Sequence, residues 1–202
     1  MSGAGGVVRD DRAVDDRLST TQTSRTTRRV VLVPGVLALL PEYAGLTDPV
    51  AELRSACLEA VGWLTGPVSV IGTGQGRRVA EALLRERGLE AQAPRGPSHL
   101  DQREAASYLV VGNGSACRTE KAPGHLDERA HPFDQRLERA LRSPDPAVLG
   151  AVDEALAGEL WADVAGIRAL GGLLAGARPA QVEYADDPFG VQYWVMRWQC
   201  ES

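Results

Sequence analysis

The sequence has few of the residues that bind metal ions. Its 202 residues include three histidines, His99, His125 and His131. Zinc and non-haem iron sites need histidine, cysteine or carboxylate ligands brought to one point, usually at recognisable spacings. Two histidines six residues apart in a proline-containing segment match no standard spacing. We therefore predict no metal ligands and no cofactor.

Cysteine is equally scarce. Cys57, Cys117 and Cys200 are the only three, and none forms a CxxC pair. An odd number at wide spacing is unlike a secreted disulfide framework, so a reducing cytoplasm is the expected location. No apolar run approaches the roughly 18 to 20 residues that span a bilayer, and no membrane association is expected.

Basic residues do not dominate either. The formal net charge is -5, and Lys121 is the only lysine. A nucleic-acid-binding surface needs a positive excess, so nucleic acid is not an expected partner. A small molecule is the partner class that remains, and the oligomeric state is left open.

The first 27 residues differ from the rest of the chain. They mix Gly, Asp, Arg, Ser and Thr with almost no large apolar side chains. Such a segment cannot bury enough apolar surface to offset the entropy of ordering. We predict a disordered tail over residues 1–27 and one domain over 28–202.

Within that domain, short β-branched runs alternate with segments of helical periodicity. This order predicts an α/β fold, a single domain whose mostly parallel central sheet carries helices on both faces, with a C-terminal strand pair. The predicted strands are 29–33, 68–71, 107–111, 181–185 and 191–198. The predicted helices are 49–64, 77–87, 132–142, 145–160 and 162–174.

The carboxyl ends of parallel strands share one edge of a sheet, where α/β proteins bind their ligands. Pro34-Gly35, the 72–76 loop and the 112–131 loop should meet there. The 72–76 loop, GTGQG, is neither GxGxxG nor a P-loop, because no lysine follows it. A tight glycine turn is the favoured interpretation, and an anion site using Arg77 and Arg78 is the alternative.

The segment from 112 to 134 concentrates unusual polar chemistry. A connection this long favours a functional loop. Ser115 or Cys117 would be a nucleophile only if His125 folded back as its base, and there is no G-x-S-x-G elbow. The alternative is an Arg-Glu-Lys network that fixes the loop, with His131 leading into the next helix.

Four stretches, in order, resemble the class III extradiol ring-cleavage dioxygenase superfamily. They are VPGVLALLPE at 33–42, GNGSACRTEKAPGHLDERAHPFD at 112–134, DPAVLGAVDEALAGEL at 145–160 and YADDPFGVQYWVMRW at 184–198. The similarity is to its catalytic B-subunit-like branch, specifically to short actinobacterial members. The resemblance implies an α/β fold and, in active members, Fe(II) held by two histidines and a glutamate beside a catalytic histidine.

This chain departs from the family pattern at each expected histidine. The first metal-ligand position is Gly35, although Pro34, Pro41 and Glu42 are kept. The second falls in the 73–76 loop, and the catalytic histidine falls at Ala116. Glycine and alanine neither coordinate iron nor move protons. The resemblance thus implies a fold whose metal site has been lost.

We expect such a domain to keep a cleft that binds a small molecule. An anionic molecule is one form of this expectation. One alternative is a non-catalytic interaction or scaffold protein, in which the 112–134 loop is a structural lid. A second is a metal-dependent ring-cleaving enzyme with ligands rearranged onto His99, His125 and His131. The candidate catalytic residues are Ser115, Lys121 and His125, and the candidate ligand-binding residues are Glu42, Asn113, Arg118 and Glu120.

Overall fold

A computed structural model describes residues 1, 3, 27–45, 47–92 and 107–201 of the chain. The tail predicted over residues 1–27 falls almost entirely outside this part. His99 also lies outside the described residues.

Six strands form one mixed sheet in the order β3-β2-β4-β1-β6-β5. Their bounds are β1 (Thr27–Val33), β2 (Val68–Ile71), β3 (Ala91–Gln92), β4 (Ser107–Val111), β5 (Gln181–Asp186) and β6 (Tyr193–Glu201). β1, β2, β3 and β4 pair in parallel, whereas β6 runs antiparallel to both β1 and β5. The predicted mostly parallel sheet with a C-terminal strand pair is confirmed.

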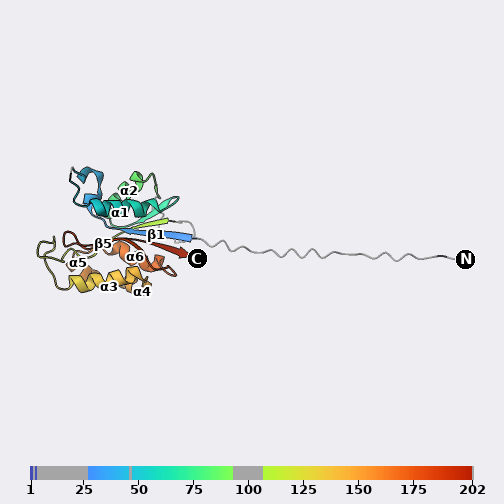
Figure 1. Cartoon of the computed structure of the whole chain (residues 1–202). Coiled ribbons are helices and arrows are strands. Elements are labelled where there is room, and N and C mark those ends of the chain that lie inside the picture. The colour runs from blue at the N-terminus through green and yellow to red at the C-terminus, as the bar shows by residue number, and fades with distance from the viewer. Residues whose placement is uncertain (2, 4–26, 46, 93–106, 202) are drawn as a thin grey trace.

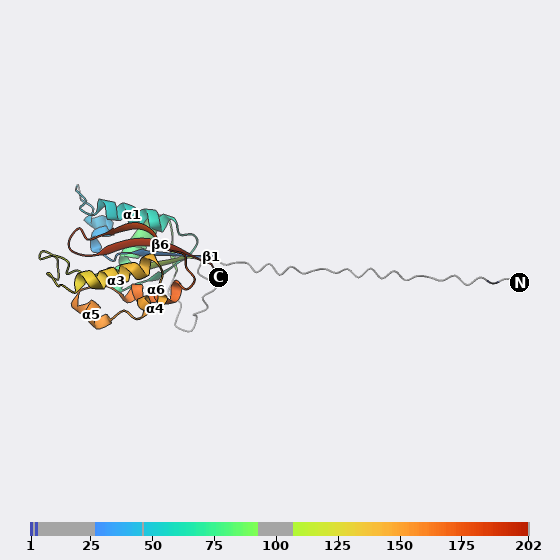
Figure 2. The ribbon, with the colours of Figure 1, turned by 60° about the horizontal axis from the view of Figure 1, so that its bottom comes forward.

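Helices cover both faces of this sheet (Figures 1 and 2). On one face lie α1 (Ala51–Gly62) and α2 (Gly74–Glu86). On the other lie α3 (Ala130–Arg142), α4 (Pro146–Gly150), α5 (Glu154–Glu159) and α6 (Ala165–Leu173). Two short 3-10 helices, η1 (Leu37–Leu39) and η2 (Pro41–Tyr43), follow β1. None of the helices in the described ranges is long and apolar enough to cross a membrane.

The sequence of β1 is a continuous apolar run, and the burial of its residues on both faces of the sheet explains why. Val31 and Val33 are fully buried in the core under α1 and α2. Val30 and Leu32 are fully buried in the opposite core, under α3, α4 and α6. A strand covered on both faces has no solvent side, so its sequence does not alternate with polar residues.

The helix predicted over 145–160 is wrong in its continuity. It is two helices, α4 and α5, separated at residues 151–153. The Asp153 carboxylate accepts hydrogen bonds from the backbone N-H groups of Ala155 (2.9 Å) and Leu156 (3.0 Å). An aspartate that bonds to the backbone ahead of it starts a new helix, because these N-H groups have no partner inside the first turn.

The start of α2 also differs from the prediction, at Gly74 in place of residue 77. The Thr73 hydroxyl caps this helix by accepting from the Gly76 N-H at 3.3 Å. The glycine-rich segment is therefore mostly the first turn of a helix. Its polar side chains consequently lie at the carboxyl edge of the sheet.

Candidate functional site

The loops after β1, β2 and β4 meet at one edge of the sheet, as predicted. β1 and β4 are neighbours, but the helices that follow them cover opposite faces, so the chain diverges between their carboxyl ends. Gly35 packs so closely that a Cβ on it would lie 3.1 Å from Val111 Cγ1 and 3.3 Å from Gly76 Cα. The Gln75 side-chain amide donates to the Gly35 carbonyl at 2.9 Å, which joins the first two loops.

One carboxylate joins this edge from far along the chain. Asp163 lies between α5 and α6, and its Oδ2 accepts a hydrogen bond from the Thr73 hydroxyl at 3.3 Å. Its carbonyl accepts from the Asn113 N-H at 3.0 Å, just past the end of β4. We call Thr73, Gln75, Asn113 and Asp163 the carboxyl-edge cluster.

The electrostatics of Asp163 are unusual for a partly exposed acid. Burial raises the pKa of Asp163, while the hydrogen bonds from Thr73 and from the Ala165 N-H act in the opposite direction. A carboxyl group with a raised pKa among polar neighbours can exchange a proton with a ligand or accept its hydrogen bonds. Sequence reasoning missed Asp163, because it falls within a predicted helix and no local motif distinguishes it.

Among the predicted ligand-binding residues, Asn113 lies in this cluster. Its side-chain amide donates to the Gly114 carbonyl at 3.0 Å, and the residue is partly exposed. Glu42 lies in η2, where its exposed carboxylate pairs with Arg78 at 2.6 Å. Arg77, considered with Arg78 as an anion partner, donates to the Val70 carbonyl at 3.1 Å.

The predicted catalytic residue Ser115 is part of a buried network. Its side chain is fully buried, and its hydroxyl donates to Asp134 Oδ2 at 2.6 Å. Its backbone N-H donates to Asp134 Oδ1 at 2.8 Å. Arg118 completes the network, because its guanidinium donates to Asp134 at 3.0 Å and to Asp187 at 2.5 Å. We call Ser115, Arg118, Asp134 and Asp187 the loop network.

The other predicted residues of this loop lie at its surface. Glu120, Lys121 and His125 are exposed, as is His131 in α3. His125 Nδ1 lies 2.8 Å from the Glu120 carbonyl oxygen. Because the Ser115 hydroxyl is bonded to Asp134 instead, the structure does not form the serine-imidazole pair that nucleophilic catalysis requires.

The iron site that the resemblance implies does not fit these residues. Gly35 stands at the first ligand position and brings no donor atom, and the second region, residues 73–76, contains no histidine. A Cβ on Gly35 would lie 3.3 Å from Gly76 Cα, and a Cβ on Gly76 would lie 2.7 Å from Val111 Cγ1. The third position, Ala116, is buried in the core. Close packing leaves no room there for imidazole rings, and over the described ranges no three His, Cys, Asp or Glu side chains converge on a metal position.

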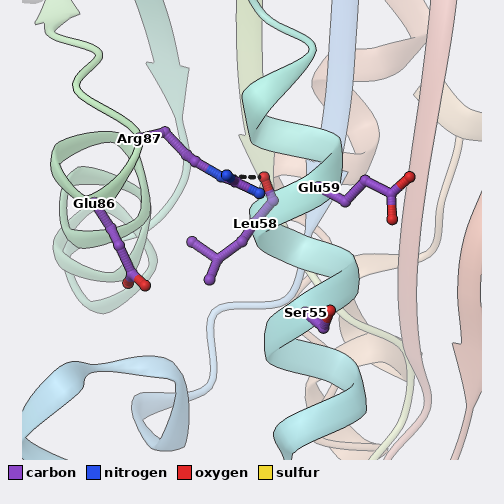
Figure 3. Close-up of a pocket in the computed structure, with 5 residues that line it drawn as sticks. All are labelled: Ser55, Leu58, Glu59, Glu86 and Arg87. Carbon is purple, nitrogen blue, oxygen red and sulfur yellow. Dashed lines mark hydrogen bonds between the residues drawn. The ribbon is translucent and has the colours of Figure 1, made fainter.

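A pocket of about 330 Å³ lies between α1 and the end of α2 (Figure 3). Its polar side chains do not converge on one point. Arg87 donates to the Leu58 carbonyl at 2.7 Å, and Glu59 points away from both Arg87 and Glu86. This pocket therefore lacks the convergence of polar groups that the carboxyl-edge cluster has.

Comparison with protein-family models and with curated proteins gives no match to this chain.

Proposed function

We propose that this chain is an extradiol-dioxygenase-like protein that works without the family's iron site and binds a small molecule at the carboxyl-edge cluster. The observation that carries the proposal is the partly buried Asp163 carboxyl group, set against the Thr73 hydroxyl where the loops after β1, β2 and β4 converge. In α/β sheets, ligands bind at the point where neighbouring strands send their connections to opposite faces.

The cluster favours a ligand that donates hydrogen bonds. Asp163 supplies acceptor oxygens, and the amide groups of Gln75 and Asn113 supply both donors and acceptors. The anionic version of the ligand is less well supported, because the Arg118 guanidinium is already bonded to Asp134 and Asp187. A neutral or amine-bearing molecule with hydroxyl or amino groups is the class we propose.

An NMR-detected screen of the ¹⁵N-labelled full chain tests this function. Small polyols, amines, catechols and carboxylates are added one at a time, and amide shifts are followed. We expect polyol, catechol or amine hits to move the amides of Gly74, Gln75 and Asn113, and D163N to weaken those hits. E128Q, an exposed acid on the loop before α3, is the matched control. Hits confined to other surfaces, or hits unchanged in D163N, would contradict the proposal.

A second candidate is the interaction or scaffold protein. It is favoured because the loop network uses the side chains of the 112–134 loop internally. Near the 112–134 loop, Trp161 and Phe189 are 62% and 46% exposed. Sedimentation velocity over a hundredfold concentration range tests self-association, with W161S as the variant that should abolish it. A sedimentation coefficient that stays at the monomer value at every concentration would exclude self-association.

The third hypothesis, a metalloenzyme with rearranged histidine ligands, has a direct test. Elemental analysis of protein purified without chelator measures bound iron, manganese and zinc. We expect less than stoichiometric metal. One tightly bound ion per chain, lost in a His125→Ala and His131→Ala double variant, would overturn the metal-free proposal.

A further inference from the structure

A second pocket, unrelated to the carboxyl edge, lies where α3, α4 and α5 come together. Its volume is about 420 Å³, and residues 151–153 form part of its lining. Those residues are the break between α4 and α5. Asp153, whose carboxylate caps α5, is one of these lining residues.

The walls of this pocket are mainly apolar. Phe133, Val148, Val152 and Leu156 line it, and each remains partly exposed to solvent. Their inner surfaces pack against the buried clusters beneath the sheet and the loop. Partly exposed apolar walls around a volume of a few hundred Å³ are typical of sites that bury the body of a small ligand.

Among the residues that the structure describes, the charged side chains at the rim differ in whether they have partners. Arg129 is bonded to Asp127 and to Glu159. The Asp153 carboxylate is used by the N-H groups of α5. Arg136 has no ion pair or side-chain hydrogen bond with any residue that the structure describes.

The sequence of α3 gives Arg136 no acidic partner on its own helix face. Side chains three and four positions apart on a helix are neighbours. For Arg136 these neighbours are Pro132, Phe133, Arg139 and Ala140, and none is acidic. A guanidinium that bonds to no described residue, at the rim of an apolar pocket, is complementary to an anion attached to an apolar body.

We propose that this pocket binds a small monocarboxylate with an apolar body, whose carboxylate pairs with Arg136. A guanidinium matches the two oxygens of a carboxylate in a bidentate arrangement. Over the described ranges Arg136 is the one lining cation without a partner, which suits a singly charged head group better than a dianion such as a phosphate monoester. The pocket volume accommodates a chain or ring of drug-like or smaller size.

The test compares three probes that share one apolar body and differ in head group: octanoate, 1-octanol and octylammonium, all below their aggregation concentrations. Each is titrated into the ¹⁵N-labelled full chain at low salt. We expect octanoate to shift the amides of Val152 and Leu156, and to bind about fivefold more tightly than octanol, the upper range for a solvent-exposed ion pair. Octylammonium should bind more weakly than octanol.

Two variants on α3 isolate the role of charge. R136Q should reduce octanoate affinity to that of octanol, while R139Q, which removes an exposed arginine one turn away, should leave it unchanged. The proposal is overturned if octanoate leaves the Val152 and Leu156 amides unmoved. Equal affinity for the three probes, or equal effects of R136Q and R139Q, would overturn it as well. None of these outcomes depends on the carboxyl-edge cluster, so a failure here is separable from a failure of the proposed function.

Discussion

Replacing Asp134 by alanine should destabilise the protein severely, because this carboxylate holds the loop network together. Asp134 is 1% exposed and accepts three hydrogen bonds, two from Ser115 and one from Arg118. D134A leaves the buried Ser115 N-H and hydroxyl without acceptors. It also leaves Arg118 with Asp187 alone.

The magnitude follows from these contacts. Leaving a buried donor unsatisfied costs about 1 to 3 kcal/mol, and removing one member of a buried ion pair costs about 3 to 5 kcal/mol in total. These contributions overlap, so we expect D134A to lower the free energy of unfolding by about 4 kcal/mol. S115A removes one bond and leaves the carboxylate its other two donors. We expect it to cost about 1.5 kcal/mol.

The assay is guanidinium chloride unfolding at pH 7, followed by circular dichroism, for wild type, D134A, S115A and the double variant. Since the Ser115 hydroxyl has no acceptor in D134A, adding S115A to that variant should cost much less than S115A alone. The coupling energy should therefore be about 1 kcal/mol or more. A D134A cost below about 1 kcal/mol, or strict additivity of the two changes, would refute the structural role that we assign to this network.

Three further predictions concern other parts of the fold. Gly166→Ala in α6 should destabilise the protein by about 2 kcal/mol or more, because a Cβ there would overlap the Val111 carbonyl of β4. In the same helix, a Cβ on Gly172 would meet nothing within 4 Å, so Gly172→Ala should be neutral or stabilise the protein by up to about 1 kcal/mol. Thermal unfolding compares the two variants. Trp161, at φ 57°, has the left-handed backbone conformation just after α5. Glycine adopts this conformation at less cost than alanine, so W161G should be more stable than W161A by about 1 kcal/mol in denaturant unfolding. The opposite order would contradict that conformation. Burial raises the pKa of Asp163, so the folded protein holds this proton more tightly than the unfolded chain does; its contribution to stability is full below about pH 4 and is lost as the pH rises through the folded-state pKa. D163N should therefore gain stability relative to wild type as the pH rises above about 4. In an NMR titration Thr73→Val should raise the Asp163 pKa further, since it removes a bond that favours the ionised form.

Several elements were predictable because their pattern is local. The runs VSVI and SYLVV give β2 and β4 at the predicted bounds, 68–71 and 107–111. All residues of β4 except the partly buried Tyr108 are buried, whereas β2 alternates buried Val68 and Val70 with partly buried Ser69 and Ile71; in both strands a short run rich in β-branched residues is sufficient to define the element. The convergence of the loops after β1, β2 and β4 followed from chain order alone, because parallel strands end at one edge.

The candidate site was much less predictable. The sequence predicts Ser115 and His125 as catalytic residues and Arg118 as a ligand-binding residue, but their interactions depend on partners that the pattern does not reveal. Asp134 is 19 positions from Ser115, in a segment that reads as an ordinary helix start. Its carboxylate accepts both hydrogen bonds that Ser115 donates, which hold that residue within the buried loop network and separate from His125.

The sequence by itself determined the alternation of strands and helices, the positions of the buried strands and the lack of histidines where the resembled family binds iron. The tertiary structure alone decided that Asp163 lies beside Thr73, 90 positions away, and that Gly35 and Gly76 pack against each other. Local hydrophobic periodicity specifies which face of an element is buried. It does not specify which polar side chains from distant segments share that burial, because their contacts form only once the sheet and both helical layers have packed.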